Sequence, residues 1–200
     1  MRNRLSPRSR SHSARKVETR EERPRFLIVC EGEKTEPNYF RGFRVSSMDL
    51  EVVGEGDNTK RLVLIAEEKR AKSDYDQVWV VFDRDSFPAE HFNEAMQRAR
   101  ALGIRVAYSN EAFEIWYLLH FDFHQAGIER GRYAALLSSK LGRSYKKNDP
   151  SIFQVLLPHQ ETAIRHAAKL AAIYDPPRPE RDNPSTTVHL LVAELRKFAV

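Results

Sequence analysis

Short apolar runs alternate with helix-like segments along the first half of the chain. The runs occupy residues 26–30, 50–53, 78–82 and 104–108. Runs of this length, rich in Val and Ile, are typical of strands buried on both faces of a parallel sheet. Apolar residues at helical spacing follow the first three runs, at about residues 37–43, 59–72 and 89–102. This alternation predicts an α/β fold with a doubly wound, Rossmann-like parallel sheet of about four strands.

The second half of the chain changes to helical periodicity. We expect helices at residues 112–121, 130–141, 149–156, 160–174 and 187–198. A Gly-led basic turn at 142–149 and a Pro-rich loop at 176–185 interrupt them. The predicted organisation is a tail at residues 1–25, an α/β core at 26–125 and a helical portion at 126–200 that packs on the core.

Composition narrows the class of protein. The chain has 200 residues, of which 41% are hydrophobic and 30% charged, as in soluble globular proteins. No apolar run approaches the roughly 18 residues of a membrane span, and the N-terminal residues lack the apolar stretch of a secretion signal. Cys30 is the only cysteine, which excludes an intramolecular disulfide and a cysteine-based metal cage. We therefore expect a cytoplasmic protein.

The basic charge is concentrated in the tail. Residues 1–25 hold nine Lys or Arg and three Glu, a net charge of +6, and the whole chain has +5, so the remaining residues carry −1. A segment so poor in apolar residues is expected to stay disordered and to attract a polyphosphate. The candidate nucleic-acid contacts are Arg2, Arg4, Arg8, Arg10, Arg15 and Lys16. The alternative is a solubilising tail without a dedicated partner.

Acidic residues follow the predicted strands. Glu31 comes directly after the first strand, Asp83 and Asp85 come after the third, and Glu114 comes shortly after the fourth. Sites in open parallel sheets form beyond the carboxyl ends of the strands, so we expect these carboxylates to converge. The alternative for an Asp after a strand is a helix cap or a turn.

Convergence of several carboxylates has an electrostatic cost. Two anions about 6 Å apart repel by roughly 3 kcal/mol at an effective dielectric constant near 20. A divalent cation would offset the repulsion, and a set of oxygen ligands selects Mg²⁺ or Mn²⁺ over zinc. Mg²⁺ leaves coordination positions for phosphate oxygens, so the acids predict phosphoryl chemistry.

At this point the residues show a family resemblance. The segments CEGEKTEPNYF (30–40), VVFDRDSF (80–87), SNEAFEIWYLLHF (109–121) and NPSTTVHLLVAEL (183–195) together resemble the RloB family, which is found with restriction and abortive-infection loci. That family is similar to the TOPRIM domains of OLD-type nucleases, topoisomerases and primases. The resemblance therefore implies a TOPRIM-like sheet and covers nearly the whole chain after the tail.

The resemblance also implies roles for the acids. Glu31 corresponds to the TOPRIM glutamate, which binds metal or acts in proton transfer, and Asp83 and Asp85 correspond to metal ligands. Glu36 matches the second glutamate of the OLD-type EGxxE motif, although this chain has one residue more between the two glutamates. Glu114 is the remaining acidic ligand that we expect.

Basic and histidine residues are weaker candidates. Lys146 and Lys147, adjacent in a loop, suit charge neutralisation in a phosphoryl transition state. Lys34 is a candidate phosphate contact, or else a solvated loop residue. The histidines lack ligand spacing such as HExxH, and we expect them to be structural. The alternative for His120, in the LLHF segment near the acidic centre, is a functional hydrogen bond at the site. Ser185 to Thr187 read first as a helix N-cap.

The leading hypothesis is a Mg²⁺- or Mn²⁺-dependent nuclease of antiphage defence that hydrolyses DNA or tRNA. The competing hypothesis is a binding module that holds nucleic acid or an ATPase and cuts nothing. OLD-type nucleases carry an ATPase in the same chain, but this sequence has no GxxxxGK[ST] loop, so an ABC-type ATPase would have to come from a separate chain. Assembly into a homodimer is a further expectation.

Overall fold

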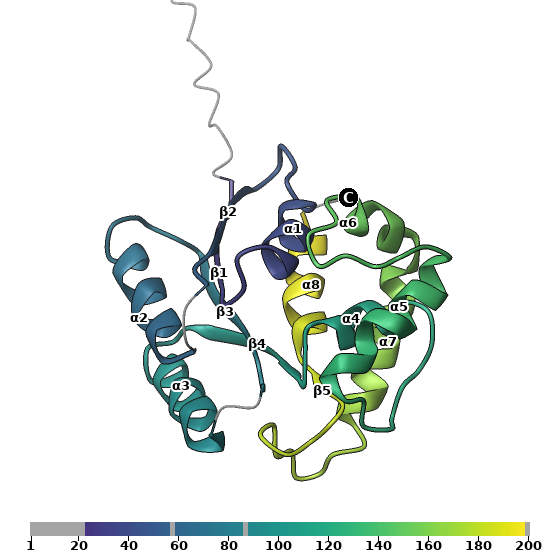
Figure 1. The fold of residues 1–200 in the computed structure, drawn as a ribbon. Coiled ribbons are helices and arrows are strands. Elements are labelled where there is room, and N and C mark those ends of the chain that lie inside the picture. Colours follow the sequence, from purple (N-terminus) through teal and green to yellow (C-terminus); the bar gives the residue numbers. More distant parts are fainter. Residues whose placement is uncertain (1–22, 57–58, 86–87, 199–200) are drawn as a thin grey trace, which may run out of the picture.

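The sheet has five strands, in the order β2-β1-β3-β4-β5 (Figure 1). The computed structural model describes residues 23–56, 59–85 and 88–198. The strands β1 (Arg25–Cys30), β2 (Asp49–Gly54), β3 (Gln77–Asp83) and β4 (Arg105–Asn110) run parallel, which confirms the predicted α/β sheet. The two-residue strand β5 (Ser185–Thr186) pairs antiparallel with β4.

The helix N-cap expected at Ser185 to Thr187 is found at Thr187, whereas Ser185 and Thr186 form the strand β5. Thr186 donates its hydroxyl to the Tyr108 carbonyl oxygen at 3.0 Å, and Thr187 Oγ1 accepts from the Tyr108 N–H at 3.0 Å. Thr187 precedes helix α8 (Val188–Arg196), yet its side chain makes no capping hydrogen bond. These hydroxyls attach the C-terminal segment to the edge of the sheet, a contact that a local pattern does not reveal.

Alternating residues of the central strands divide the core into two layers. Leu27 and Val29 face the helices α2 (Thr59–Arg70) and α3 (Ala89–Ala101), whereas Ile28 and Cys30 face the opposite side. All four of these side chains are fully buried, as expected of central strands covered on both faces. The layer made by α2 and α3 is called the α2–α3 layer below (Figure 1).

The opposite face of the sheet is covered by helices from both halves of the chain. These are α1 (Thr35–Arg41), α4 (Glu114–Leu118), α5 (Tyr133–Leu141), α6 (Ile152–Leu156), α7 (Gln160–Ala171) and α8, with the 3₁₀ turns η1 (Arg130–Arg132) and η2 (Leu157–His159). Tyr39, Phe113 and Trp116 pack edge to face within this layer. It is called the aromatic layer below. The expected helix at 112–121 is shorter here, because residues beyond Leu118 form a turn.

Across residues 23–56, 59–85 and 88–198, each helix is too short or too polar to cross a membrane.

Candidate acidic site at the strand ends

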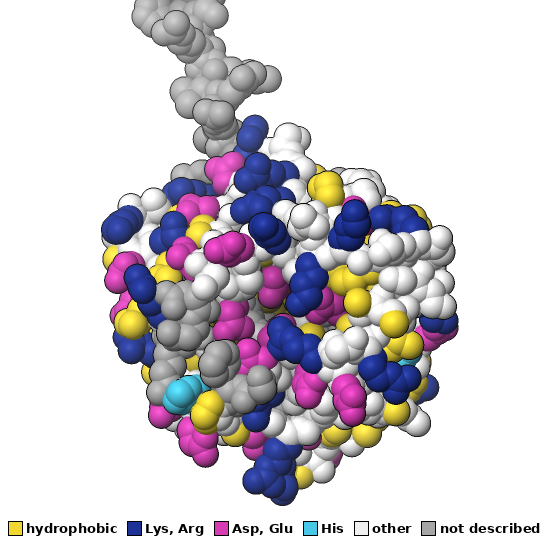
Figure 2. Space-filling view, viewed as in Figure 1, with side chains coloured by type: hydrophobic (Ala, Val, Ile, Leu, Met, Phe, Trp, Pro, Cys, Tyr) yellow, Lys and Arg dark blue, Asp and Glu magenta, His cyan; other side chains and the backbone are white. Residues whose placement is uncertain are grey.

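A pocket of about 340 Å³ lies beyond the carboxyl ends of β1 and β3, between the sheet and the aromatic layer. Glu36, Asp83 and Glu114 line it together with Arg130 and Lys147. Figure 2 shows acidic side chains near the middle of this face of the molecule with basic side chains beside them. The acids come from the loop after β1, from α1, from the end of β3 and from the start of α4, so the chain topology brings together residues up to 83 positions apart.

Glu31 is held in a defined orientation beside this pocket. Its Oε1 accepts a hydrogen bond from Thr59 Oγ1 at 2.7 Å, and its Oε2 accepts from the Asp83 backbone N–H at 3.1 Å. Burial raises the pKa of Glu31, and the nearby Asp85 carboxylate raises it further, while the two hydrogen bonds act in the opposite direction. Glu31 therefore connects the ends of β1 and β3.

The environment of Asp83 disfavours the charged form of its carboxyl group. Burial raises its pKa well above the usual range, and the charges of Glu36 and Glu114 raise it further. Arg130 Nη2 lies 3.4 Å from Asp83 Oδ2 and lowers the pKa in part. Oδ1 is buried and has no hydrogen-bond partner among the described residues. A buried carboxylate oxygen without a donor is costly unless a ligand completes it.

Glu36 joins the site from the first turn of α1. Its side chain is 6% exposed, and burial, followed by the charges of Glu114 and Glu31, raises its pKa to about 7. Gly32 makes room for this carboxylate, because a Cβ at position 32 would overlap Glu36 Oε2. The glycine of the EG motif is therefore needed to leave space for the Glu36 side chain. Glu36 lies beside the other acids although one more residue separates it from Glu31 than in the EGxxE motif.

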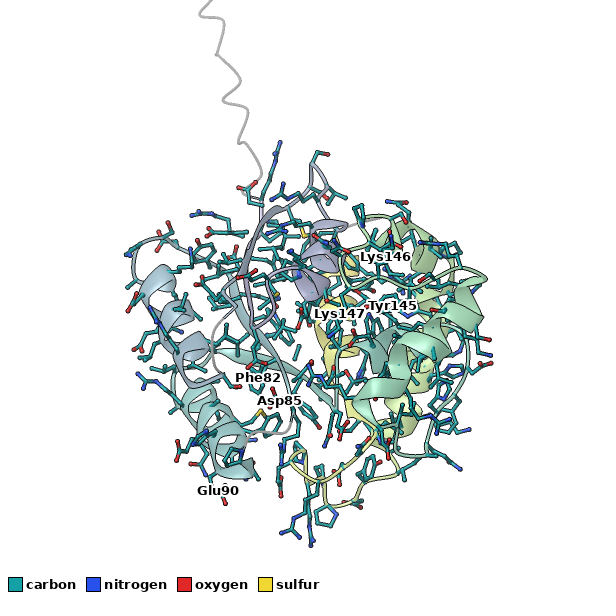
Figure 3. All side chains as sticks on the ribbon, in the orientation of Figure 1. Phe82, Asp85, Glu90, Tyr145, Lys146 and Lys147 are labelled. Atoms are coloured by element: carbon teal, nitrogen blue, oxygen red, sulfur yellow. The ribbon has the colours of Figure 1, made fainter. Side chains whose placement is uncertain are left out.

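Glu114 approaches from the aromatic layer. Tyr145 donates its hydroxyl to Glu114 Oε1 at 3.2 Å, and Lys147 Nζ lies 3.8 Å from the same oxygen. The Glu114 side chain is only 5% exposed, whereas that of Lys147 is 64% exposed. Figure 3 shows Lys147 in the space between the sheet and the helices of the aromatic layer.

Asp85 lies next to this group of acids without lining the pocket. It is partly buried and close enough for its charge to raise the pKa of Glu31. Arg84, between the two aspartates, donates to the Glu180 carbonyl oxygen at 3.2 Å. That bond ties the end of β3 to the Pro-rich loop.

The predicted basic residues are placed differently from one another. Lys34 is exposed and lines the pocket, and Lys147 pairs with Glu114. Lys146 is exposed, and it is not among the residues that line the pocket. The tail candidates Arg2, Arg4, Arg8, Arg10, Arg15 and Lys16 lie outside the described residues.

His120 is a core residue. It is 1% exposed, its Nδ1 lies 2.9 Å from the Trp116 carbonyl oxygen, and burial lowers its pKa to about 4. Its ring packs on Trp116 at a centroid distance of 4.8 Å. A neutral, buried histidine in the aromatic layer agrees with the structural role that the sequence suggested.

Sequence reasoning missed Thr59, Arg130 and Tyr145. Thr59 begins a helix, Arg130 stands in the unremarkable segment GIERGRY, and Tyr145 directly precedes the two lysines. Only Tyr145 had a signal, as an aromatic residue within a basic loop. The other two are recognised through contacts made across 28 and 47 residues of chain.

The donor set fits a hard divalent cation in chemistry, although not as a ready-made cage. The acids offer carboxylate oxygens only, and the unpartnered Asp83 oxygen and the mutual repulsion would both be relieved by a cation. Within residues 23–56, 59–85 and 88–198, however, no three His, Cys, Asp or Glu side chains are grouped as ligands of one ion. Their oxygens are instead turned toward Thr59, Arg130, Tyr145 and Lys147.

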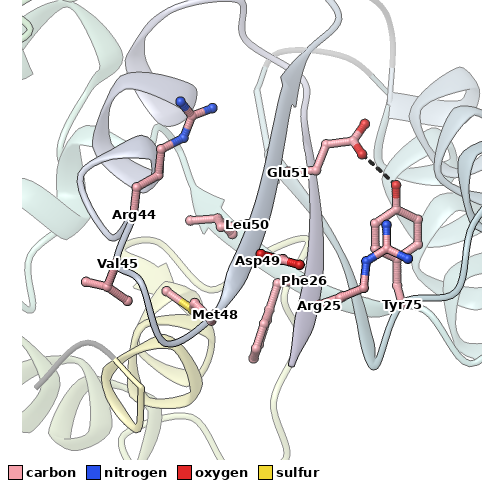
Figure 4. A pocket seen from close by; sticks show the side chains of 9 residues that line it. All are labelled: Arg25, Phe26, Arg44, Val45, Met48, Asp49, Leu50, Glu51 and Tyr75. Carbon is pink, nitrogen blue, oxygen red and sulfur yellow. Dashed lines mark hydrogen bonds between the residues drawn. The ribbon is translucent and has the colours of Figure 1, made fainter. Parts of the chain in front are cut away.

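A second pocket, of about 380 Å³ beside β2, contains an acid, Glu51, that is paired with donors and cations (Figure 4). There Tyr75 donates to Glu51 Oε2 at 2.5 Å, Lys69 lies 3.3 Å from Glu51 Oε1, and Arg25 covers the Tyr75 ring at 5.1 Å. These contacts lower the pKa of Glu51. The raised pKa values at the strand ends have no counterpart at this acid.

Comparison with known proteins identifies a family. The family model described as RloB-like protein matches residues 26–195. Neither the curated proteins nor the solved structures include one that matches this chain.

Proposed function

The chain belongs to the RloB-like protein family, and we propose that it is a divalent-metal-dependent phosphodiesterase that cuts nucleic acid. One observation carries the proposal: four carboxylates from separate segments lie together at the strand ends, with Glu36 and Glu114 buried and Glu31 and Asp83 partly buried. Burial and repulsion raise the pKa of Glu31, Glu36 and Asp83. Perturbed pKa values that cluster in a pocket are characteristic of functional sites. A packed core without chemistry has no need of this repulsion.

In this proposal the acids hold the cation. Asp83 and Glu114, which line the pocket, would be the central ligands, with Glu31, Glu36 and Asp85 around them. A bound Mg²⁺ or Mn²⁺ would polarise the scissile phosphate and favour the attack of water. The chain's own part is to orient these oxygens through Thr59 and Tyr145.

Proton transfer falls to the glutamates beside the ligands. Glu31, which two hydrogen bonds hold in place beside the pocket, is the candidate acid or base, and the nearby Glu36 is the second candidate. Lys147 and Lys34, which line the pocket, would offset the negative charge that develops on the phosphate, with Lys146 outside the lining as a weaker contributor.

Cleavage of DNA and of tRNA in MgCl₂ or MnCl₂ tests the proposal, comparing the wild type with Asp83→Ala. The matched control is Asp74→Ala, because Asp74 is exposed and precedes β3, at the opposite end of the strand from Asp83. We expect Asp83→Ala to lose on the order of 10³-fold in rate, since a metal ion contributes several kcal/mol. Equal activity of wild type and Asp83→Ala would reject the assigned centre.

A second candidate function is a module that binds nucleic acid or a partner and cuts nothing. It is favoured by the absence of a grouped ligand set in the described part of the chain. Calorimetry with MnCl₂ separates the two in part. Absence of binding removes both the enzyme and a structural metal, whereas binding without cleavage of either substrate supports the module.

The biological setting is proposed from the resemblance to the RloB family. We place the protein in the bacterial cytoplasm, in antiphage defence, under the control of an ABC- or AAA-type ATPase encoded nearby and with a homodimer as its assembly. The neighbouring genes test this setting. An adjacent ATPase gene would support a regulated nuclease, and a gene that stands only beside restriction subunits would favour an accessory role.

A further inference from the structure

Arg130 has an anchored backbone and an accessible guanidinium group. Its N–H donates to Glu111 Oε2 at 2.8 Å, which fixes the start of η1. Its Nη2 lies 3.4 Å from Asp83 Oδ2, and the side chain remains 45% exposed at the wall of the acidic pocket. The group therefore reaches both an acid of the site and the solvent in front of it.

Lys147 repeats this arrangement at a second acid. Its ammonium group lies 3.8 Å from Glu114 Oε1 and is also largely exposed. Both cations belong to the C-terminal half of the chain, in η1 and in the loop that precedes α6, whereas Glu31, Glu36 and Asp83 belong to the N-terminal half. Glu114, the partner of Lys147, belongs to the C-terminal half as well, so only the Arg130–Asp83 pair joins the two halves of the chain.

These ion pairs are replaceable. Both cations are close to half exposed or more, whereas the side chains of Asp83 and Glu114 are only 10% and 5% exposed. A cation that leaves a buried acid must be replaced by another positive charge. A divalent cation that took the same carboxylate oxygens would repel the guanidinium and ammonium groups. Freed from the acids, the planar guanidinium fork has the geometry that binds a phosphate with two parallel hydrogen bonds.

We propose that Arg130 is the residue that binds the substrate phosphate: it pairs with Asp83 in the free protein and passes to the nucleic-acid backbone once a divalent cation occupies the Asp83 oxygens. Lys147 makes the corresponding exchange at Glu114. This inference rests on the proposed metal-dependent function and adds to it the group that recognises the substrate, which is the phosphate backbone and not a base.

The test measures binding and not cleavage. A fluorescein-labelled single-stranded oligodeoxynucleotide is titrated with wild type, Arg130→Gln and Lys147→Gln, in EDTA and in CaCl₂, by anisotropy at several salt concentrations. The matched control is Arg98→Gln, because Arg98 pairs with Glu67 at 3.4 Å and is 47% exposed, close to Arg130 in both respects, but belongs to α3.

In CaCl₂ we expect Arg130→Gln to weaken oligonucleotide binding about tenfold and to lower the salt slope by about one, as for the loss of one charged phosphate contact. In EDTA the loss should be smaller, since Arg130 is then held by Asp83. Calorimetry with MnCl₂ should show unchanged or tighter metal binding. Arg98→Gln should match the wild type in every titration.

Equal oligonucleotide binding by Arg130→Gln and wild type in CaCl₂ would overturn the proposal, and so would a loss of MnCl₂ binding in the variant. Arg130→Lys, which keeps the charge and the fold but lacks the fork, should lie between wild type and Arg130→Gln. Failure of the metal centre itself is recognised separately, because Asp83→Asn would then bind MnCl₂ as the wild type does. If Arg130 served only to stabilise the fold, Arg130→Gln would lower the melting temperature, and its effect on oligonucleotide binding would be the same in EDTA and in CaCl₂.

Discussion

The two layers that cover the sheet differ in what they bury. The α2–α3 layer contacts the sheet through aliphatic and small side chains such as Val63, Ala66 and Ala95, with Phe92 as its helical aromatic residue. The aromatic layer buries Trp116 and Tyr117 together with the polar groups Glu36, Glu114 and His120. Buried polar groups lower the stability of the fold unless they are paired, and these groups lie in the aromatic layer. The difference indicates that one layer supports the sheet and the other builds the site.

Removal of one large aromatic side chain from each layer is the strongest way to break this comparison. Trp116→Ala and Phe92→Ala should each lower the free energy of unfolding by about 3–5 kcal/mol, because both side chains are buried in a packed core. Only Trp116→Ala should also weaken MnCl₂ binding, since Trp116 lies two residues from Glu114 on α4. Urea denaturation and calorimetry at a temperature where both variants are folded would measure the two effects. Similar metal binding by both variants would contradict the division between layers.

Glu36 should make the metal-free protein less stable as the pH rises. Its pKa is raised from 4.5 to about 7 in the folded protein, so its contribution to stability is present below pH 4.5 and is lost as the pH rises through 7. Glu36→Gln should remove this loss and raise the free energy of unfolding above pH 7 by about 1–3 kcal/mol in EDTA. Urea denaturation across this pH range is the measurement. If the variant had the same pH dependence of stability as the wild type, the pKa of Glu36 would not be raised in the folded protein.

His120 should act in the opposite pH direction. Its pKa is lowered from 6.5 to about 4 by burial, so the stability that comes from its neutral form is present above pH 6.5 and is lost as the pH falls through 4. His120→Gln should reduce the loss of stability at acid pH by about 1–3 kcal/mol, similar to the effect expected for Glu36→Gln above pH 7. His91→Gln is the control, because His91 is exposed on α3 in the other layer. Equal acid sensitivity of the two variants would refute the role of burial at His120.

The smallest expected effect concerns the contribution of the α2–α3 layer to the site. Thr59 at the start of α2 donates to Glu31 Oε1, and Thr59→Val keeps the shape while removing the donor. We expect a loss of stability of about 1 kcal/mol and less than a tenfold loss of cleavage. Thr162→Val on α7, which removes a hydroxyl contact with Arg165, is the control. A larger loss than that of Asp83→Ala would place the α2–α3 layer within the chemistry itself.

The sequence alone predicted the parallel strands and the acids at their ends. Runs such as 78–82 are apolar at every position because both faces of the strand are covered, and this local property can be read without the fold. The placement of Asp83 and Glu31 follows from the rule that parallel strands end at the same edge. Strand β5 escaped prediction because two polar residues carry no periodicity, and their partners lie on β4.

Only the tertiary structure decided which groups face the acids. Arg130 and Tyr145 contact Asp83 and Glu114 across 47 and 31 residues of chain, and neither contact follows from residue type or local spacing. Residue type and spacing also do not show that Lys147, and not Lys146, contacts Glu114. The directions of adjacent loop side chains are set by the turn and its packing. Local sequence determines which backbone segments can form strands and helices. The partner and the pKa of a buried carboxylate depend on which distant side chains the packed layers bring within a few ångströms.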